Sequence, residues 1–109
     1  MKAPSVENIF ARLPKPLGPE QFSTLFENEA VKIERIVSQS SNAPAEFWYD
    51  QPRDEWVIVL RGQATLEFES GELFEMREGD FAAISSHVKH RVLKTDAATI
   101  WLAVHAKAP

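Results

Sequence analysis

The sequence has no cysteine and no long hydrophobic run. Without cysteine, neither disulfide bonds nor thiolate metal sites can form. The longest uninterrupted apolar run, Trp56 to Leu60, is far shorter than the roughly 18 residues that a membrane-spanning helix needs, so we expect a soluble protein. Residues 1–10 lack the apolar core of a secretory signal, which favours a cytoplasmic location.

Basic side chains are also scarce. The 109 residues include 12 lysines and arginines against 16 aspartates and glutamates, giving a net charge of -4. No cluster of basic residues is long enough to follow a phosphate backbone, so nucleic acid and anionic membranes are poor partners. The length suits a single domain with its own core, and the chain shows no internal repeat.

Residues 1–21 are predicted to form a short helix and an arm that precede the main domain. Ser5 is a suitable helix cap, and Pro14 ends the segment. A stiff, extended arm should follow, because each proline fixes its own backbone, and it would lie across the domain or across a partner subunit. The apolar residues at helical spacing are Val6, Ile9, Phe10 and Leu13; the arm contains Pro14, Pro16, Gly18 and Pro19.

Residues 22–109 read as short strands separated by turns. A closed barrel and a two-sheet jelly roll are the two architectures that fit so many strands in so few residues, and an immunoglobulin-type sandwich is the rival. The predicted strands are Ser23–Glu27, Val31–Val37, Glu46–Asp50, Glu55–Arg61, Gln63–Glu69, Glu72–Arg77, Phe81–Ile84, Arg91–Lys94 and Thr99–Ala106.

Two of these strands differ in their hydrophobic pattern. Glu55–Arg61 is apolar on both faces and must be covered on both sides. Gln63–Glu69 alternates, so Ala64, Leu66 and Phe68 should face the core. Ser70-Gly71 then provides a two-residue hairpin turn that leads into the next strand.

Two separated stretches resemble the motifs of the cupin family. Glu55, followed by six residues and Gly62, resembles the second half of the first cupin motif. The run from Gly79-Asp80 to His90 resembles the second motif, with His90 at the position of its histidine. The resemblance implies a small all-β, cupin-type jelly-roll barrel. It also implies a divalent metal cation (manganese, iron or zinc) in the barrel mouth.

The first motif departs from the family pattern, which places two histidines, one residue apart, a few residues before the glutamate. A spacing of four residues selects Trp48 and Asp50, and a spacing of three selects Tyr49 and Gln51. Because side chains alternate along a strand, only one of these pairs can face the interior. The commoner spacing in the family favours Trp48 and Asp50.

The expected site therefore combines three strands. Asp50, Glu55 and His90 are the predicted metal ligands, and Glu55 and His90 are also the predicted catalytic residues. One imidazole and two carboxylates suit a divalent cation with open positions for water or substrate. The predicted pocket residues are Trp48, Gln51 and His105, and His105 is an alternative second nitrogen ligand beside His90 and Glu55.

A structural explanation of the same residues stays open. Asp50 lies near Pro52 in a turn where aspartate is common, Glu55 can pair with Arg53 or Arg91, and a lone histidine is more often structural than functional. Two functions follow. The first is a metal-dependent protein that acts on or senses a small polar molecule, as an isomerase, lyase or dioxygenase. The second is a metal-free ligand-binding or assembly module.

Aromatic residues are numerous for so small a domain. Trp48, Tyr49, Trp56 and Trp101 suggest an additional buried face. We therefore expect a homodimer, in which the doubly apolar strand or the N-terminal arm meets the partner subunit. Pairing of this kind would also protect strand edges that an open barrel leaves unpaired.

Overall fold

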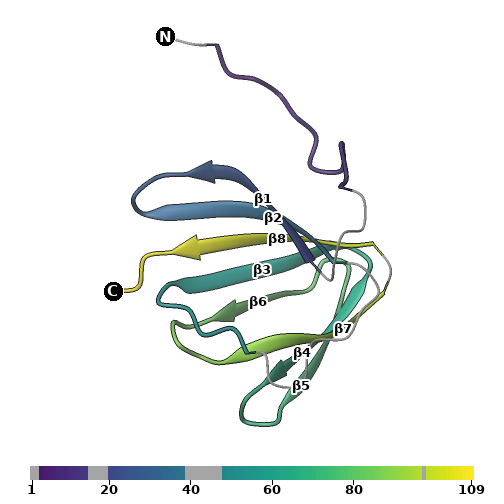
Figure 1. The fold of residues 1–109 in the computed structure, drawn as a ribbon, viewed down its shortest axis with the longest axis vertical. Helices are drawn as coiled ribbons and strands as arrows, with labels where there is room; N and C mark the ends of the chain where they lie inside the picture. Colours follow the sequence, from purple (N-terminus) through teal and green to yellow (C-terminus); the bar gives the residue numbers. More distant parts are fainter. Residues whose placement is uncertain (1–2, 15–19, 39–47, 97) are drawn as a thin grey trace.

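A computed structural model describes residues 3–14, 20–38, 48–96 and 98–109 of the chain. Two antiparallel sheets form the domain, as the jelly-roll prediction requires (Figure 1). The strands are β1 (Glu20–Glu27), β2 (Val31–Ser38), β3 (Asp54–Arg61), β4 (Gln63–Phe68), β5 (Leu73–Arg77), β6 (Phe81–Ile84), β7 (His90–Thr95) and β8 (Thr99–Ala106).

The strand order brings together segments that are distant in the chain. The larger sheet has the order β1-β2-β8-β3-β6, and the smaller sheet has the order β5-β4-β7. The last strand, β8, therefore lies between β2 and β3 (Figure 1). In the β3–β8 pair, Glu55 stands directly opposite His105, so the fold makes neighbours of two polar residues that are distant in the chain.

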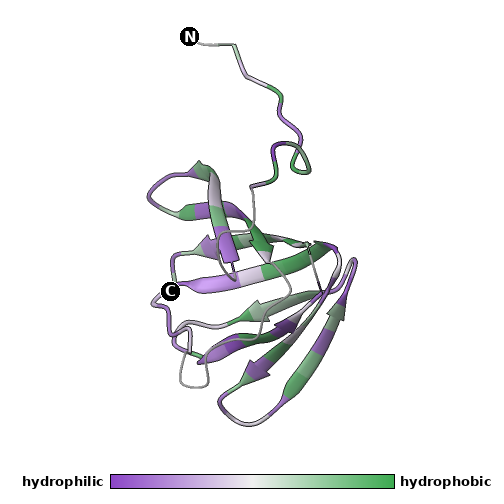
Figure 2. Cartoon of the chain, turned by 45° about the vertical axis from the view of Figure 1, so that its right-hand side comes forward, coloured by the Kyte–Doolittle hydropathy of each residue, from purple (hydrophilic) through white to green (hydrophobic). Residues whose placement is uncertain are grey.

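The core lies between the inner faces of the two sheets. Val57 and Val59 of β3 meet Ala64 and Leu66 of β4, and all four are buried. The strands carry both hydrophobic and hydrophilic residues (Figure 2). Along β4, buried and partly exposed residues alternate, which confirms the inward face predicted for Ala64 and Leu66. Burying each large aliphatic side chain contributes about 1.5–3 kcal/mol, so this layer is a main source of stability.

The predicted N-terminal helix is wrong. Residues 3–14 contain a turn at Asn8, whose side chain accepts a hydrogen bond from the Phe10 backbone N–H at 2.8 Å. This local bond competes with helix formation. The guanidinium of Arg35 also bonds to the carbonyls of Ile9, Ala11 and Arg12, which a continuing helix would use itself.

Other boundaries differ less. Residues 15–19 of the proline arm and residues 46–47 of the predicted strand Glu46–Asp50 lie outside the described residues. From that strand, Tyr49 forms an isolated bridge to His90 rather than a longer ladder. β1 begins at Glu20, slightly before the expected start of the barrel.

No helix in the described part of the chain has the length and apolar character needed to span a membrane.

Candidate functional site

A cavity of about 50 Å³ opens between the sheets. Its apolar lining comes from the core strands, and the space suits a few water molecules or one end of a small organic molecule. Among the described residues that line it, none is lysine or arginine. The polar side chains on its wall are Glu20, Glu34, Tyr49, Gln51, Glu55 and His90.

Glu55 and His90 meet at this cavity, as the sequence predicts. His90 Nε2 lies 3.1 Å from Glu55 Oε1, and the two residues are only 5% and 8% exposed. β3 presents Glu55 from the larger sheet, whereas β7 presents His90 from the smaller one. The contact therefore forms only when the two sheets close on each other, and Glu55 pairs with His90 while Arg91 pairs with Glu67.

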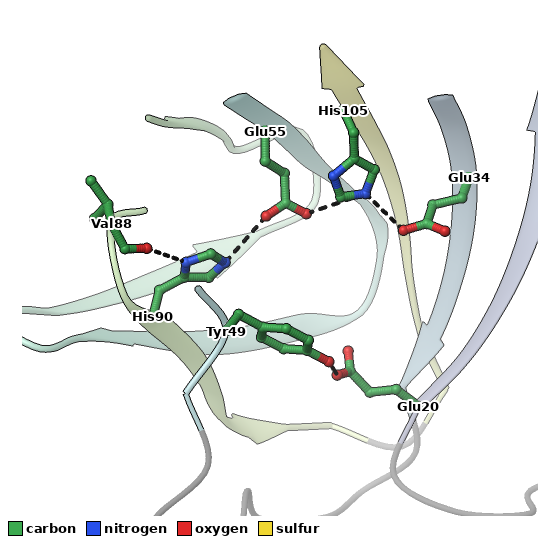
Figure 3. Close-up of polar contacts among 7 residues, drawn as sticks. All are labelled: Glu20, Glu34, Tyr49, Glu55, Val88, His90 and His105. Carbon is green, nitrogen blue, oxygen red and sulfur yellow. Dashed lines mark hydrogen bonds and ion pairs between the residues drawn. The ribbon is translucent and has the colours of Figure 1, made fainter. Parts of the chain in front are cut away.

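The hydrogen-bond partners of the two His90 ring nitrogens indicate which of them carries a hydrogen. Its Nδ1 lies 2.8 Å from the Val88 carbonyl oxygen, which only accepts, so Nδ1 carries a hydrogen (Figure 3). Burial lowers the pKa of His90, but the hydrogen bonds to Glu55 and Val88 and the charge of Glu55 outweigh it, and the pKa is raised above 6.5. The contact with Glu55 thus favours the protonated form of the His90 imidazole.

A second imidazole stands on the other side of Glu55. His105 Nε2 lies 2.8 Å from Glu34 Oε1 and 3.8 Å from Glu55 Oε2 (Figure 3). Glu34, Glu55 and His105 are all buried. Four side chains from β7, β3, β8 and β2 therefore form a continuous chain of acid and imidazole groups, in which each carboxylate faces at least one histidine.

Tyr49 and Glu20 form a separate polar group on the cavity wall. The Tyr49 hydroxyl donates to Glu20 Oε1 at 2.6 Å (Figure 3). The other Glu20 oxygen accepts from the Ser38 hydroxyl. Burial raises the pKa of Glu20 even though these hydrogen bonds lower it. Burial and the neighbouring charge of Glu20 raise the pKa of Tyr49 as well, so the phenol keeps its proton.

The expected inward orientation of Trp48 and Asp50 is wrong. Tyr49 and Gln51 line the cavity instead, Asp50 Oδ1 lies 2.7 Å from the exposed His87 side chain, and Trp48 packs under the guanidinium of Arg91. The backbone decides this register, because Tyr49 exchanges two hydrogen bonds with His90. A shift of one residue would turn every side chain to the opposite face.

Three polar side chains of the cavity wall were not among the predicted site residues: Glu20, Glu34 and Tyr49. The sequence indicated the position of Glu34, which lies two residues before Ile36 on β2 and therefore shares its inward face. Tyr49 belonged to the less favoured register. Glu20 precedes the first predicted strand, and no local pattern marks it as buried. His105 does face inward with Trp101 and Ala103, as its alternation suggested.

The donor atoms do not gather as a metal site requires. His90 Nε2 is hydrogen-bonded to Glu55 and His105 Nε2 to Glu34, and Asp50 is turned away from the cavity. Across the described residues, no group of three or more histidine, aspartate or glutamate side chains is placed to hold an ion. The residue types suit a divalent cation, but their present arrangement does not fit one.

Comparison with known proteins agrees with the fold. A family model described as Cupin domain matches residues 40–105. No curated protein matches the chain. The structure resembles a protein from Ralstonia eutropha JMP134, provisionally described as a mannose-6-phosphate isomerase, with 44% identity and a TM-score of 0.89; the match covers 96% of this chain and 100% of that one.

More distant structures share the fold alone. An RmlC-like cupin from Shewanella frigidimarina is 15% identical with a TM-score of 0.70, over 86% of this chain and 81% of that one. A conserved Streptococcus pyogenes protein of unknown function is 17% identical with a TM-score of 0.75, over 100% of this chain and 92% of that one.

Proposed function

This chain belongs to the cupin family, and from that premise we propose that it binds a small polar organic molecule in the barrel and moves a proton on it with Glu55 and His90. The observation that carries the proposal is the buried contact of 3.1 Å between Glu55 Oε1 and His90 Nε2 on the cavity wall. The corresponding reaction class is that of an isomerase or a lyase.

The two side chains have complementary roles in this reaction. In this proposal Glu55 acts as a carboxylate and His90 as an imidazolium. Glu55 accepts a proton from a carbon or oxygen atom of the bound molecule, and His90 Nε2 donates a proton to an oxygen atom. Because both groups are buried, little water competes for these protons. In an isomerisation, protonated Glu55 then delivers its proton to the neighbouring carbon of the intermediate and neutral His90 regains one from the neighbouring hydroxyl, which forms the product and restores both groups.

The lining of the cavity favours a substrate without a phosphate group. Glu20, Glu34 and Glu55 line the cavity, and no lysine or arginine does so among the described residues. A phosphate placed there would lie beside carboxylates with no cation to bind it. The Ralstonia eutropha protein is provisionally described as acting on a phosphorylated sugar, so we propose an unphosphorylated polyol or carbonyl compound for the present chain.

Proton exchange at carbon tests this proposal without a known product. Small aldoses, ketoses and hydroxy acids, with mannose 6-phosphate among them, are incubated with the protein in D₂O, and the loss of carbon-bound ¹H is followed by NMR. We expect enzyme-dependent exchange in an unphosphorylated compound. Glu55→Gln and His90→Gln should each lower the rate by about 10²-fold or more, the usual contribution of an acid–base group.

Asp50→Asn is the matched control, because it removes a carboxylate that points away from the cavity. Its exchange rate should stay within about twofold of the native rate. Equal loss in all three variants would contradict the assignment of Glu55 and His90. Saturable binding of a compound without any exchange would instead support the alternative function, a ligand-binding module with no turnover.

The metal remains a separate question, because a dioxygenase would need one. Protein purified without an affinity tag or added metal is analysed for bound elements, in the native form and as Glu55→Ala and His90→Ala. Stoichiometric manganese, iron or zinc that both variants lose would show that the side chains rearrange to form a metal site. Thermal stability unaffected by added divalent cations would favour the metal-free proton transfer.

A further inference from the structure

We propose that Glu34 and His105 are positioning residues, which hold the Glu55 carboxylate so that Oε1 faces His90 and the cavity. This inference rests on the proposed role of Glu55 and His90. It concerns the chain of contacts His90–Glu55–His105–Glu34, which spans the barrel from the smaller sheet to the second strand of the larger one (Figure 3).

The strand register places this pair behind Glu55. Glu55 and His105 stand opposite each other in the β3–β8 pair. On the other side of β8, His105 is opposite Lys32 and Glu34 is opposite Ala103, so Glu34 lies diagonally from His105 on the same face. The contact between Glu34 and His105 is therefore set by the sheet itself.

The two carboxylate oxygens of Glu55 lie near different imidazole rings. Oε1 lies 3.1 Å from His90 Nε2, and Oε2 lies 3.8 Å from His105 Nε2. A glutamate has three side-chain torsions and loses considerable freedom when it is fixed in one orientation. Two histidines on opposite sides restrict that freedom, and they leave Oε1 as the oxygen presented to His90 and the cavity.

Glu34 fixes the ring of His105 in turn. The hydrogen bond of 2.8 Å between His105 Nε2 and Glu34 Oε1 is the shorter of the two contacts of this nitrogen. Since both facing oxygens accept when ionised, His105 Nε2 carries the hydrogen, donates it to Glu34 and lies near Glu55 Oε2. With all four residues buried, these contacts are screened less than they would be at the surface.

Paired substitutions distinguish positioning from packing. His105→Gln and Glu34→Gln keep a polar group that can hydrogen-bond, whereas His105→Leu and Glu34→Leu keep a similar volume and lose it. The ring-nitrogen signals of His90 are recorded by ¹⁵N NMR of histidine-labelled protein without any ligand, and they are assigned by their loss in His90→Gln. His90 is not in direct contact with Glu34 or His105 in the chain described above.

We expect both leucine variants to shift the His90 signals by more than a linewidth and both glutamine variants to leave them within it. The exposed His87 is the internal control, and its signals should be unchanged in all four proteins. Native His90 signals in the folded leucine variants would overturn the proposal. If the leucine variants do not fold, His90 signals that shift in the glutamine variants would overturn it equally.

This experiment is independent of turnover. A shift of the His90 signals together with a failure to find proton exchange would support the positioning pair and contradict the proposed function. Loss of exchange in Glu55→Gln and His90→Gln, with native exchange and native His90 signals in His105→Leu, would support the proposed function and contradict the positioning pair.

Discussion

At the scale of single residues, Glu20 shows what burial does to one carboxylate. Its oxygens accept from Tyr49 and Ser38, but burial and the nearby charges of Glu55 and Glu34 still raise its pKa above 4.5. A carboxyl group whose pKa is raised by folding binds its proton more tightly in the folded protein than in the unfolded chain. Its contribution to stability is complete below the unfolded pKa of 4.5 and is lost as the pH rises through the higher folded value.

Glu20→Gln should therefore change how stability depends on pH. The stability of the variant minus that of the native protein should be smallest near pH 4 and should increase towards pH 8. The reason is that Glu20 loses its proton over this range and becomes a buried charge, whereas the amide stays neutral. Urea unfolding at several pH values measures this difference. The exposed Glu72→Gln is the control and should show no such trend. A relative stability of Glu20→Gln that falls as the pH rises would contradict the expected sign.

Gly62, which ends β3 in the first motif, is required for a close approach of two strands. Its φ is +94°, and an added Cβ would lie 2.6 Å from Thr99 Oγ1 and 2.8 Å from Thr99 Cα. Gly62→Ala should destabilise the fold by about 3 kcal/mol, from backbone strain and overpacking together. Gly71 has a similar φ of +95° with no atom within 4 Å, so Gly71→Ala should cost only about 1 kcal/mol.

Equilibrium unfolding in urea measures both alanine variants. The difference between them isolates the contact with Thr99, because the backbone conformation is nearly the same at the two positions. Equal destabilisation would mean that the strained φ alone, rather than the close approach to β8, explains the glycine at position 62.

At the scale of elements, one buried arginine determines the path of the N-terminal segment. Arg35 of β2 is 8% exposed and donates to the carbonyls of Ile9, Ala11 and Arg12 at 3.0, 2.7 and 3.3 Å. Arg61 also lies over the ring of Phe10, 4.3 Å from its centroid. The segment is thus attached to the sheet through backbone carbonyls, although residues nearer the N-terminus extend away from the barrel (Figure 1).

Arg35→Met should release this segment, because the apolar stem is kept and the three donors are lost. Hydrogen bonds from a charged group contribute about 1.5–3 kcal/mol each, so cleavage within residues 3–13 by a broad-specificity protease should become at least tenfold faster. Mass spectrometry of the fragments locates the cuts. Lys94→Met, at an exposed position, is the control. An unchanged cleavage rate would show that other contacts hold the segment.

At the scale of the whole molecule, the larger sheet ends in two edge strands, β1 and β6. β1 carries Phe22, Leu25 and Phe26, each about half exposed. Apolar side chains on an exposed edge strand favour association with another chain. This observation makes β1 the preferred edge for the homodimer that the sequence suggests.

Sedimentation velocity tests the dimer and its location. We expect a dimer at micromolar concentration, and Phe26→Lys should shift it towards monomer by placing a charge on the β1 edge. Phe81→Lys on β6 is the matched control, because Phe81 is also exposed and lies on the opposite edge. A monomer at all concentrations would contradict the dimer, and dissociation by Phe81→Lys alone would place the interface at β6.

The sequence by itself determined the local strand structure and the two motif positions. The alternation predicted along Gln63–Glu69, the turn at Ser70-Gly71 and the apolar strand predicted at Glu55–Arg61 depend on neighbouring residues, so their patterns are visible without coordinates. Glu55 and His90 were also placed correctly at the cavity, because the motifs fix where each strand begins.

Tertiary structure decided what depends on contacts between distant segments. The N-terminal residues have helical spacing, but Arg35 binds the carbonyls that a helix needs. Tyr49 and Gln51, rather than Trp48 and Asp50, face the cavity because Tyr49 pairs with the backbone of His90. Glu34 meets His105 only because β8 lies beside β2, and side-chain alternation along a single strand cannot specify which strand becomes its neighbour.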